Sequence, residues 1–229
     1  MQPVQQINFD LTPSSNEEFR QFMLSMYNHT AGGLATSFLS AMFVLGSGLM
    51  PFLMSGMMLW ITMLAPLGMI IYYSFKGQDW DLPTLTGFYY LFTAVMGIGL
   101  SSVFLLFTTN SIVETFLVTS LTFGFASAYG HYTKRDLSGM GSFLFMGLIG
   151  IIIAFIINLF LASSTFSLAI SVLGIFIFLG LTMWDTQMAR RIFEETGDPR
   201  YGIKFALSLY LNFVNLFQML LSFTGVRED

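Results

Sequence analysis

The sequence predicts an all-α polytopic membrane protein, a bundle of seven transmembrane helices. Of its 229 residues, 55% are hydrophobic and 10% are charged, whereas a soluble domain has a charged fraction near ~25%. The mean hydropathy is +0.71, and the charged residues gather in short stretches between long uncharged intervals. A spanning helix needs about 20 mostly apolar residues, and these intervals have room for seven such helices.

The first uncharged interval, 21–75, is long enough for two helices. Gly46, Ser47 and Gly48, followed by Pro51, have the composition of a chain break. We therefore expect the first two spans near 27–48 and 52–75.

The third and fourth spans are bounded by polar turns. Lys76–Pro83 is a polar segment whose Trp80 suits the membrane interface, and 85–107 after it predicts the third span. A Thr-Thr-Asn-Ser turn then precedes a fourth span near 112–130. Glu114 is expected in the first turn of that span, where the helix dipole favours a carboxylate. This position predicts a structural role at the outer interface.

The last three spans follow from one further interval and a helix stop. The interval 137–184 holds two helices, which the small polar residues 162–165 separate. The sixth helix is expected to continue through Asp185 to the basic pair at 190–191. A Gly and a Pro in Glu194–Pro199 then predict its end, and 203–224 predicts the seventh span.

The chain is expected to be a single membrane domain. We assign 1–26 to a short N-terminal segment, 27–224 to the helices and 225–229 to a C-terminal tail. The N-terminal segment lacks the pattern of a signal peptide and is expected to remain in the mature protein. Cysteine is absent, which excludes disulfides and thiolate chemistry, and no basic patch suggests nucleic acid as a partner. The expected surroundings are the lipid bilayer.

The distribution of Lys and Arg predicts the orientation. Eight of the nine lie in segments on one side, namely Arg20, Lys76, Lys134, Arg135, Arg190, Arg191, Arg200 and Lys204. This bias places the N-terminus and these loops in the cytoplasm. If the seventh helix spans, Arg227 lies outside, and if that helix is re-entrant, all nine lie inside. Both endings are compatible with the sequence.

Ionisable residues at membrane depth are costly, so each is a candidate for function. Glu114, Asp185, His29 and His131 are the candidates, and the two histidines flank spans and are expected at the interface. Asp185 precedes Arg190 by five residues, which places it roughly 7 Å inside the basic rim. The same arithmetic from Lys204 places Asn212 roughly 12 Å deep. Asp185 and Asn212 are therefore predicted to lie within about one helical turn of each other.

A polar stripe accompanies Asn212 on the seventh helix. Ser208, Asn212, Asn215, Gln218 and Ser222 recur at three- and four-residue spacing, which predicts one polar face that avoids lipid. One interpretation is that the stripe and Asp185 line an ion-conducting path. The other is that these groups join helices through hydrogen bonds worth ~0.6 kcal/mol each. Lys134, Arg135, Arg190 and Arg191 are interpreted as topology determinants.

Several enzyme classes lack their residues here, and we expect no catalytic activity and no cofactor. The chain contains no Gly-x-Ser-x-Gly and no His-Glu-x-x-His motif, and its two histidines are far apart, so no metal site is predicted. An aspartyl protease needs two carboxylates that share a proton, but Asp185 has only Asn212 as a partner. A channel, a transporter or a regulatory membrane protein remains.

Three segments carry a family resemblance. They are 128–139, with Lys134, Arg135 and Asp136, then 182–187, and then 206–221. The first is similar to a loop signature of the Bax inhibitor-1 family, also called the transmembrane Bax inhibitor motif family. The second resembles the end of the sixth helix of that family and the third resembles its seventh helix, and the three occur in the family's order.

The resemblance implies a seven-helix bundle with a central last helix and a pH-sensitive calcium leak. In that family, the sixth and seventh helices each contribute an aspartate to a pair that closes the pore. Asp185 matches the first position, but Asn212 stands at the second and does not titrate. We therefore expect the fold and a cation path, a shallower or shifted pH response, and weaker affinity for calcium, which favours anionic oxygen ligands.

The resemblance also implies an alternative function. Some relatives bind other membrane proteins, including membrane proteases and cell-death or stress regulators, without conducting ions. The charged loops 134–136 and 190–204 would then form the binding surface. Short tails resemble those of bacterial members, which implies the inner membrane as the location.

Overall fold

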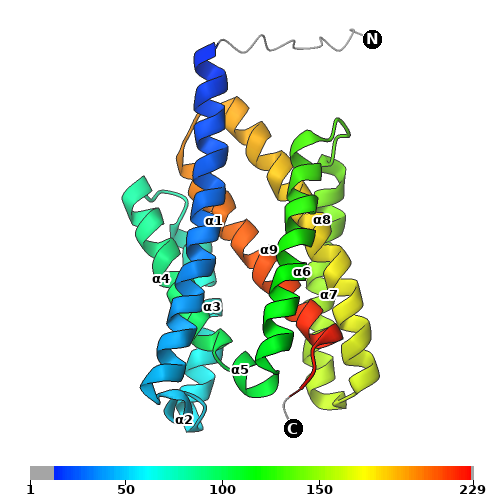
Figure 1. Ribbon diagram of the computed structural model, residues 1–229. Coiled ribbons are helices and arrows are strands. Elements are labelled where there is room, and N and C mark those ends of the chain that lie inside the picture. Colours follow the sequence, from blue (N-terminus) through cyan, green and yellow to red (C-terminus); the bar gives the residue numbers. More distant parts are fainter. Residues whose placement is uncertain (1–12, 228–229) are drawn as a thin grey trace.

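The computed structural model describes residues 13–227. Within that range it is helical, with no sheet beyond one isolated β-bridge. The helices are α1 (Pro13–Ser47), α2 (Met50–Leu53), α3 (Gly56–Lys76), α4 (Leu82–Leu100), α5 (Val103–Leu106), α6 (Thr109–Tyr132), α7 (Ser138–Leu161), α8 (Ser164–Thr196) and α9 (Arg200–Thr224). Seven of these segments are long and apolar enough to cross a membrane, and they form one bundle (Figure 1). The predicted fold class is confirmed.

The break between the first two spans lies where glycine and proline predict it. α1 ends at Ser47, and Gly48 follows with a φ of 71°. Pro51 occupies the first turn of the short helix α2, where its missing N–H costs no hydrogen bond. The second span begins only at Gly56, later than predicted, because α2 and the residues after it form a separate turn.

The third and fourth spans begin earlier than predicted because side chains cap them. The Asp81 side chain accepts the backbone N–H of Thr84, so α4 begins at Leu82. Thr108 caps α6 in the same way, so α6 begins at Thr109. Glu114 is therefore beyond the first turn of α6, and its predicted place in that turn was wrong. It lies exposed on the helix surface.

The last three spans have sharp boundaries. α7 ends before Ala162, which has a φ of 48°. α8 runs past Asp185 and ends at Thr196, and the next residue, Gly197, has a φ of 63°, which is accessible to glycine without strain. These are the breaks that the sequence predicts.

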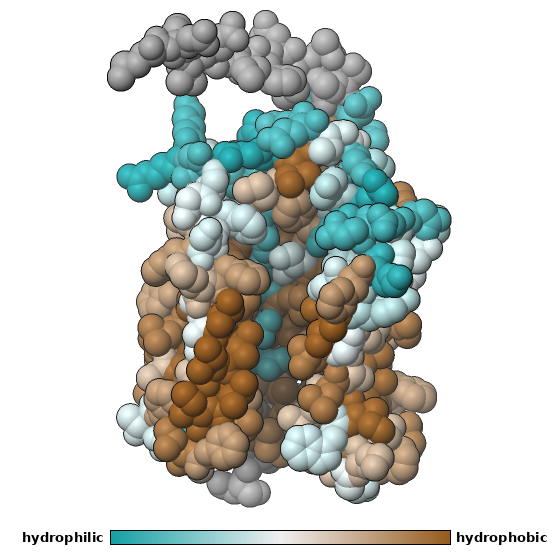
Figure 2. Space-filling view, turned by 180° about the vertical axis from the view of Figure 1, so that it is seen from behind, coloured by the Kyte–Doolittle hydropathy of each residue, from teal (hydrophilic) through white to brown (hydrophobic). Residues whose placement is uncertain are grey.

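The last helix, α9, occupies the centre of the bundle. It packs against α8, α1, α6 and α4. Leu209, Tyr210 and Leu216 on this helix are fully buried. α3 and α7 lie outside this core and expose many large apolar side chains, as expected of surfaces that face lipid. Hydrophobic residues cover the sides of the molecule (Figure 2).

α9 runs through the bundle. Its 25 residues carry the chain to the end opposite the start of α1 (Figure 1). This course agrees with the spanning ending of the two that were predicted. Hydrophilic residues gather at the N-terminal end of the molecule (Figure 2).

Two helix crossings depend on glycine. A Cβ at Gly97 in α4 would overlap the backbone of Ser37 in α1. A Cβ at Gly130 in α6 would likewise overlap the carbonyl oxygen of Met183 in α8. Small residues let membrane helices approach closely, and these two contacts fix how α1, α4, α6 and α8 surround α9.

Candidate functional site

The structure brings Asp185 of α8 together with Ser208 and Asn212 of α9. Asp185 is 4% exposed and Asn212 is 5% exposed. The Ser208 hydroxyl donates to Asp185 Oδ2 at 2.7 Å, and Asn212 Nδ2 donates to the same oxygen at 2.6 Å. Hydrogen bonds to a carboxylate are shorter and stronger than neutral ones. These two bonds therefore link α8 to the central helix at a buried carboxylate.

This cluster can offer one negative charge to a cation. Carboxylate and amide oxygens are ligands that calcium accepts, and both types are present in Asp185 and Asn212. Across residues 13–227, no three His, Asp or Glu side chains lie together as they would in a metal site.

The other residues of the polar stripe, Asn215, Gln218 and Ser222, are not among the hydrogen-bond partners of Asp185. Asn215 is half-buried, and its Nδ2 donates to the Leu211 carbonyl of its own helix at 2.8 Å. Gln218 and Ser222 are exposed. Gln218 is six positions after Asn212, which rotates the side chain by about 120° around the helix. The five residues therefore share a sector about 120° wide, and one edge of it is exposed, so the stripe is not wholly interior as predicted.

One face of the molecule is hollowed (Figure 2). Seen from behind, a groove with hydrophobic walls runs along the molecule, and hydrophilic atoms lie within it at mid-height (Figure 2). Polar groups in a membrane protein avoid lipid by facing a cavity or a neighbouring helix. This face provides such a setting between the two ends of the bundle.

A second polar chain lies beside Asp185, and sequence reasoning missed it. Tyr27 of α1 is hydrogen-bonded to Ser127 of α6 at 2.7 Å, and Ser127 to Thr186 of α8 at 3.0 Å. Thr186 follows Asp185 in the chain and is fully buried. Isolated Ser and Thr residues are common in apolar helices, so their spacing carries no signal that would predict this contact among three helices.

His131 lies at the end of α6, as predicted, but His29 lies well inside α1, so its predicted place beside a span was wrong. His29 Nδ1 is 3.1 Å from the Tyr90 hydroxyl. The His131 ring stacks on Phe19, with 6.0 Å between ring centroids. Neither side chain contributes to the hydrogen bonds of Asp185.

The loop signature is held against the end of α8. Asp136 accepts hydrogen bonds from the Ser138 backbone at 2.9 Å, from the Ser138 hydroxyl, and from Arg191 at 2.9 Å. Gln187 donates to the Arg135 carbonyl and accepts from the Leu137 N–H, both at 2.8 Å. Lys134 and Arg135 have exposed side chains. The connection from α6 to α7 is therefore fixed by two residues of α8, Arg191 and Gln187, each with two hydrogen bonds to the loop, and Gln187 was not predicted as part of this site.

This loop is expected to be insensitive to pH in the physiological range. Hydrogen bonds from Ser138, and then Arg191, lower the pKa of Asp136 from 3.8 to about 2. A lowered pKa in the folded state means that its contribution to stability is complete above the ordinary value and is lost as pH falls towards about 2. Between about pH 6 and about pH 8, we therefore expect the thermal midpoint of Asp136→Asn to shift by the same amount as the thermal midpoint of the native protein. Thermal unfolding of both proteins in detergent at several pH values measures these midpoints. A difference between the two midpoints that varies with pH in this range would contradict the prediction.

Comparisons with known proteins agree with the fold. A family model described as "Inhibitor of apoptosis-promoting Bax1" matches residues 19–229. A protein of Rickettsia prowazekii is 39% identical, with 95% of this chain and 96% of that protein covered. A protein of Caulobacter vibrioides is also 39% identical, covering 92% of this chain and 90% of its own. The inner membrane protein YbhL of Escherichia coli is 38% identical over 90% of this chain and 92% of its own.

Proposed function

Since the chain belongs to the Bax inhibitor-1 family of multi-pass membrane proteins, we propose that it is a cation leak in the bacterial inner membrane. The proposed transported ion is Ca²⁺, and the closing point is the cluster of Asp185, Ser208 and Asn212. The protein is proposed to act without a cofactor or a catalytic step. The N-terminus and the charged loops are proposed to face the cytoplasm, in accordance with the bias of Lys and Arg.

The buried, doubly hydrogen-bonded carboxylate of Asp185 carries this proposal. A carboxylate within a spanning helix is expensive and is found where ions or protons pass. Asp185 lies between α8 and the central helix α9, and both of its hydrogen bonds cross between these helices. Separating the two helices at this level would expose the carboxylate to a passing cation, so the closed and open forms differ by these two bonds.

Protonation of Asp185 affects the same contact between α8 and α9. Both bonds end on Asp185 Oδ2, and a neutral carboxyl accepts more weakly than a carboxylate. Proton binding to Asp185 therefore loosens the contact between α8 and α9. Asn212 does not titrate, so a single proton, on Asp185, governs the proposed dependence of calcium flux on pH. This dependence is therefore shallow.

The polar groups beyond Asn212 support a path towards the opposite end. Asn215, Gln218 and Ser222 continue along α9, and the last two are exposed. A cation leaving Asp185 would meet neutral oxygen ligands along α9, which hard cations prefer to hydrocarbon.

Calcium entry into liposomes tests the proposal. The purified protein is reconstituted into vesicles that contain a calcium-sensitive dye, and external calcium is added from about pH 6 to about pH 8. We expect dye fluorescence to rise faster than in protein-free vesicles, and the rate to depend on pH. Folded protein that gives no flux above protein-free vesicles contradicts a conducting role.

Asn212→Asp is expected to move the pH response of the flux to higher pH. The substitution places a second carboxylate against Asp185, and two adjacent carboxylates resist simultaneous ionisation. The pair then titrates in two steps, and the step at higher pH lies above that of Asp185 alone. Asn215→Asp, one turn further along α9, is the matched control, because the Asn215 amide bonds to its own helix. Equal pH profiles of the two variants in the liposome assay contradict a gating role for residue 212.

The alternative function, binding of another membrane protein, has one supporting observation. The loop 134–136 and the end of α8 are joined through Arg191 and Asp136 at 2.9 Å, which makes them one charged surface. Crosslinking in the native membrane, with Lys134→Ala and Arg135→Ala variants, tests it. Loss of a crosslinked partner in variants that keep full calcium flux would establish binding as a separate function.

A further inference from the structure

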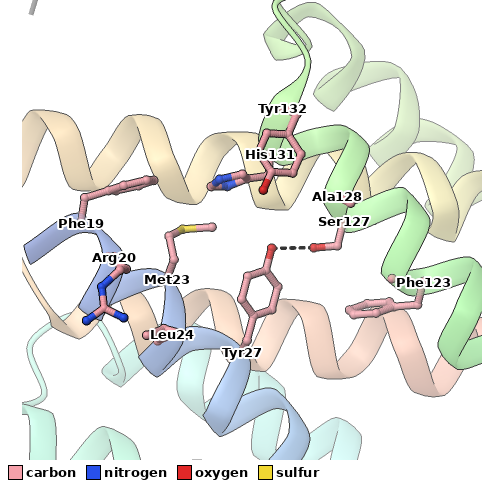
Figure 3. Close-up of a pocket in the computed structure, with 11 residues that line it drawn as sticks. Phe19, Arg20, Met23, Leu24, Tyr27, Phe123, Ser127, Ala128, His131 and Tyr132 are labelled. Atoms are coloured by element: carbon pink, nitrogen blue, oxygen red, sulfur yellow. Dashed lines mark hydrogen bonds between the residues drawn. The ribbon is translucent and has the colours of Figure 1, made fainter. Parts of the chain in front are cut away.

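A groove lies between α1 and α6 at the N-terminal end of the bundle. Its volume is about 520 Å³, within the range of roughly 300–1,000 Å³ typical of ligand sites. α1 contributes Phe19, Arg20, Met23, Leu24 and Tyr27, and α6 contributes the segment from Phe123 to Tyr132 (Figure 3). We propose that this groove binds one membrane phospholipid with a primary-ammonium headgroup, with an acyl chain between the helices.

The dimensions of the groove suit one leaflet of a bilayer. Phe19 and Tyr27 are eight residues apart on α1, which corresponds to about 12 Å along the helix axis. The hydrocarbon core of a bilayer is about 30 Å thick, so the groove extends over much of one leaflet. α1 and α6 are both spanning helices, and the groove therefore opens sideways into lipid.

The interior of the groove has few polar groups to offer. Most of the lining is apolar, and the Tyr27 hydroxyl is already bonded to Ser127 at 2.7 Å, as Figure 3 shows. Leu24 is 46% exposed in the groove wall. A Cβ at Gly124 would meet nothing within 4 Å, so the backbone of α6 is open to a ligand there. Apart from His131 Nδ1, a buried atom without a hydrogen-bond partner among the described residues, this surface suits an acyl chain, which needs no hydrogen bonds.

The rim has paired charges of both signs. Arg20 donates to Glu17 through Nε at 2.9 Å and through one terminal nitrogen at 2.7 Å. Their side chains are 63% and 49% exposed, and a guanidinium has five N–H donors. Arg190 lies over the Phe19 ring at 5.5 Å and pairs with Glu194. The Arg20 guanidinium extends away from the interior of the groove (Figure 3).

This balance of charge favours a zwitterionic headgroup. The free N–H groups of Arg20 suit a lipid phosphate, and the Glu17 carboxylate beside it suits an ammonium that donates hydrogen bonds. A choline headgroup has no N–H to donate. An anionic headgroup would gain from Arg20 and Arg190 but would be repelled by Glu17 and Glu194, so a primary ammonium is the best match.

Blocking the groove tests the site. Gly124→Leu places a side chain in the groove without a clash, because the position is open. Gly150→Leu in α7 is the matched control, since it is also open and exposed but lies outside the groove. Delipidated protein in detergent is titrated with phosphatidylethanolamine and bound lipid is counted by native mass spectrometry. We expect one tightly held lipid in the native chain and in Gly150→Leu, and about tenfold weaker binding in Gly124→Leu, equivalent to about 1.4 kcal/mol.

Headgroup preference tests the charge argument separately. The native chain is expected to retain phosphatidylethanolamine over phosphatidylcholine and phosphatidylglycerol, and Arg20→Gln is expected to lose that preference while it still binds lipid. Equal lipid binding by Gly124→Leu and the native chain overturns the site. A native preference for phosphatidylglycerol overturns the headgroup assignment, and a polypeptide that occupies the groove in place of lipid overturns the ligand class.

Discussion

Asp185→Ala is expected to reduce calcium flux to the level of protein-free vesicles. The substitution removes the buried carboxylate that the proposed path depends on. It also removes the acceptor of two hydrogen bonds, from Ser208 at 2.7 Å and Asn212 at 2.6 Å. A buried donor that loses its partner costs about 1–3 kcal/mol, so this variant is also expected to be less stable.

Asp185→Asn separates the loss of charge from the loss of structure. An asparagine side chain keeps an acceptor oxygen for the Ser208 hydroxyl and Asn212 Nδ2. Its thermal midpoint is expected to stay closer to that of the native protein than the midpoint of Asp185→Ala. Its flux and the pH dependence of that flux are both expected to be lost. Calcium entry that keeps its native pH dependence in Asp185→Asn would disprove the role of this residue.

Gly97→Ala is expected to be the most damaging conservative substitution in the bundle. A Cβ at this position overlaps backbone atoms of Ser37, and backbone has no freedom to rotate away. Overpacking costs about 1–3 kcal/mol and more where neighbours are rigid, and separating α1 from α4 also disturbs their shared contacts with α9. The expected result is a large loss of folded protein in size-exclusion chromatography and a lower thermal midpoint.

Gly87→Ala is the matched control for this prediction. Gly87 lies in the same helix, α4, and a Cβ there meets nothing within 4 Å. Alanine is more favourable than glycine in a helix by about 1 kcal/mol, so the control is expected to be neutral or slightly stabilising. Similar midpoints for the two variants would show that the close approach at Gly97 does not govern stability.

The sequence predicted those features that depend on local chemistry. Gly48 and Pro51 end one span because their backbone preferences leave few alternatives, and Gly197 ends α8 for the same reason. The proximity of Asp185 and Asn212 follows from counting residues from the basic rim. The structure places these two side chains within hydrogen-bonding distance.

Features that depend on packing between helices were beyond that reasoning. The chain contains 21 glycines, and nothing local distinguishes Gly97 or Gly130, which lie at crossings, from Gly87 or Gly150, which face open space. The rotation of α9 likewise decided that Gln218 is exposed while Asn212 is buried. Such positions are set by the faces that neighbouring helices present.

The central position of α9 has a consequence for how the protein is made. α9 follows the six other spanning helices along the chain, so it leaves the ribosome after them. Until then Asp185 lacks the Ser208 and Asn212 groups that hydrogen-bond to it, and α1, α4, α6 and α8 lack the helix that they share. Nascent chains that stop before α9 would therefore present an unpaired carboxylate and an open interior to the quality-control proteases of the membrane.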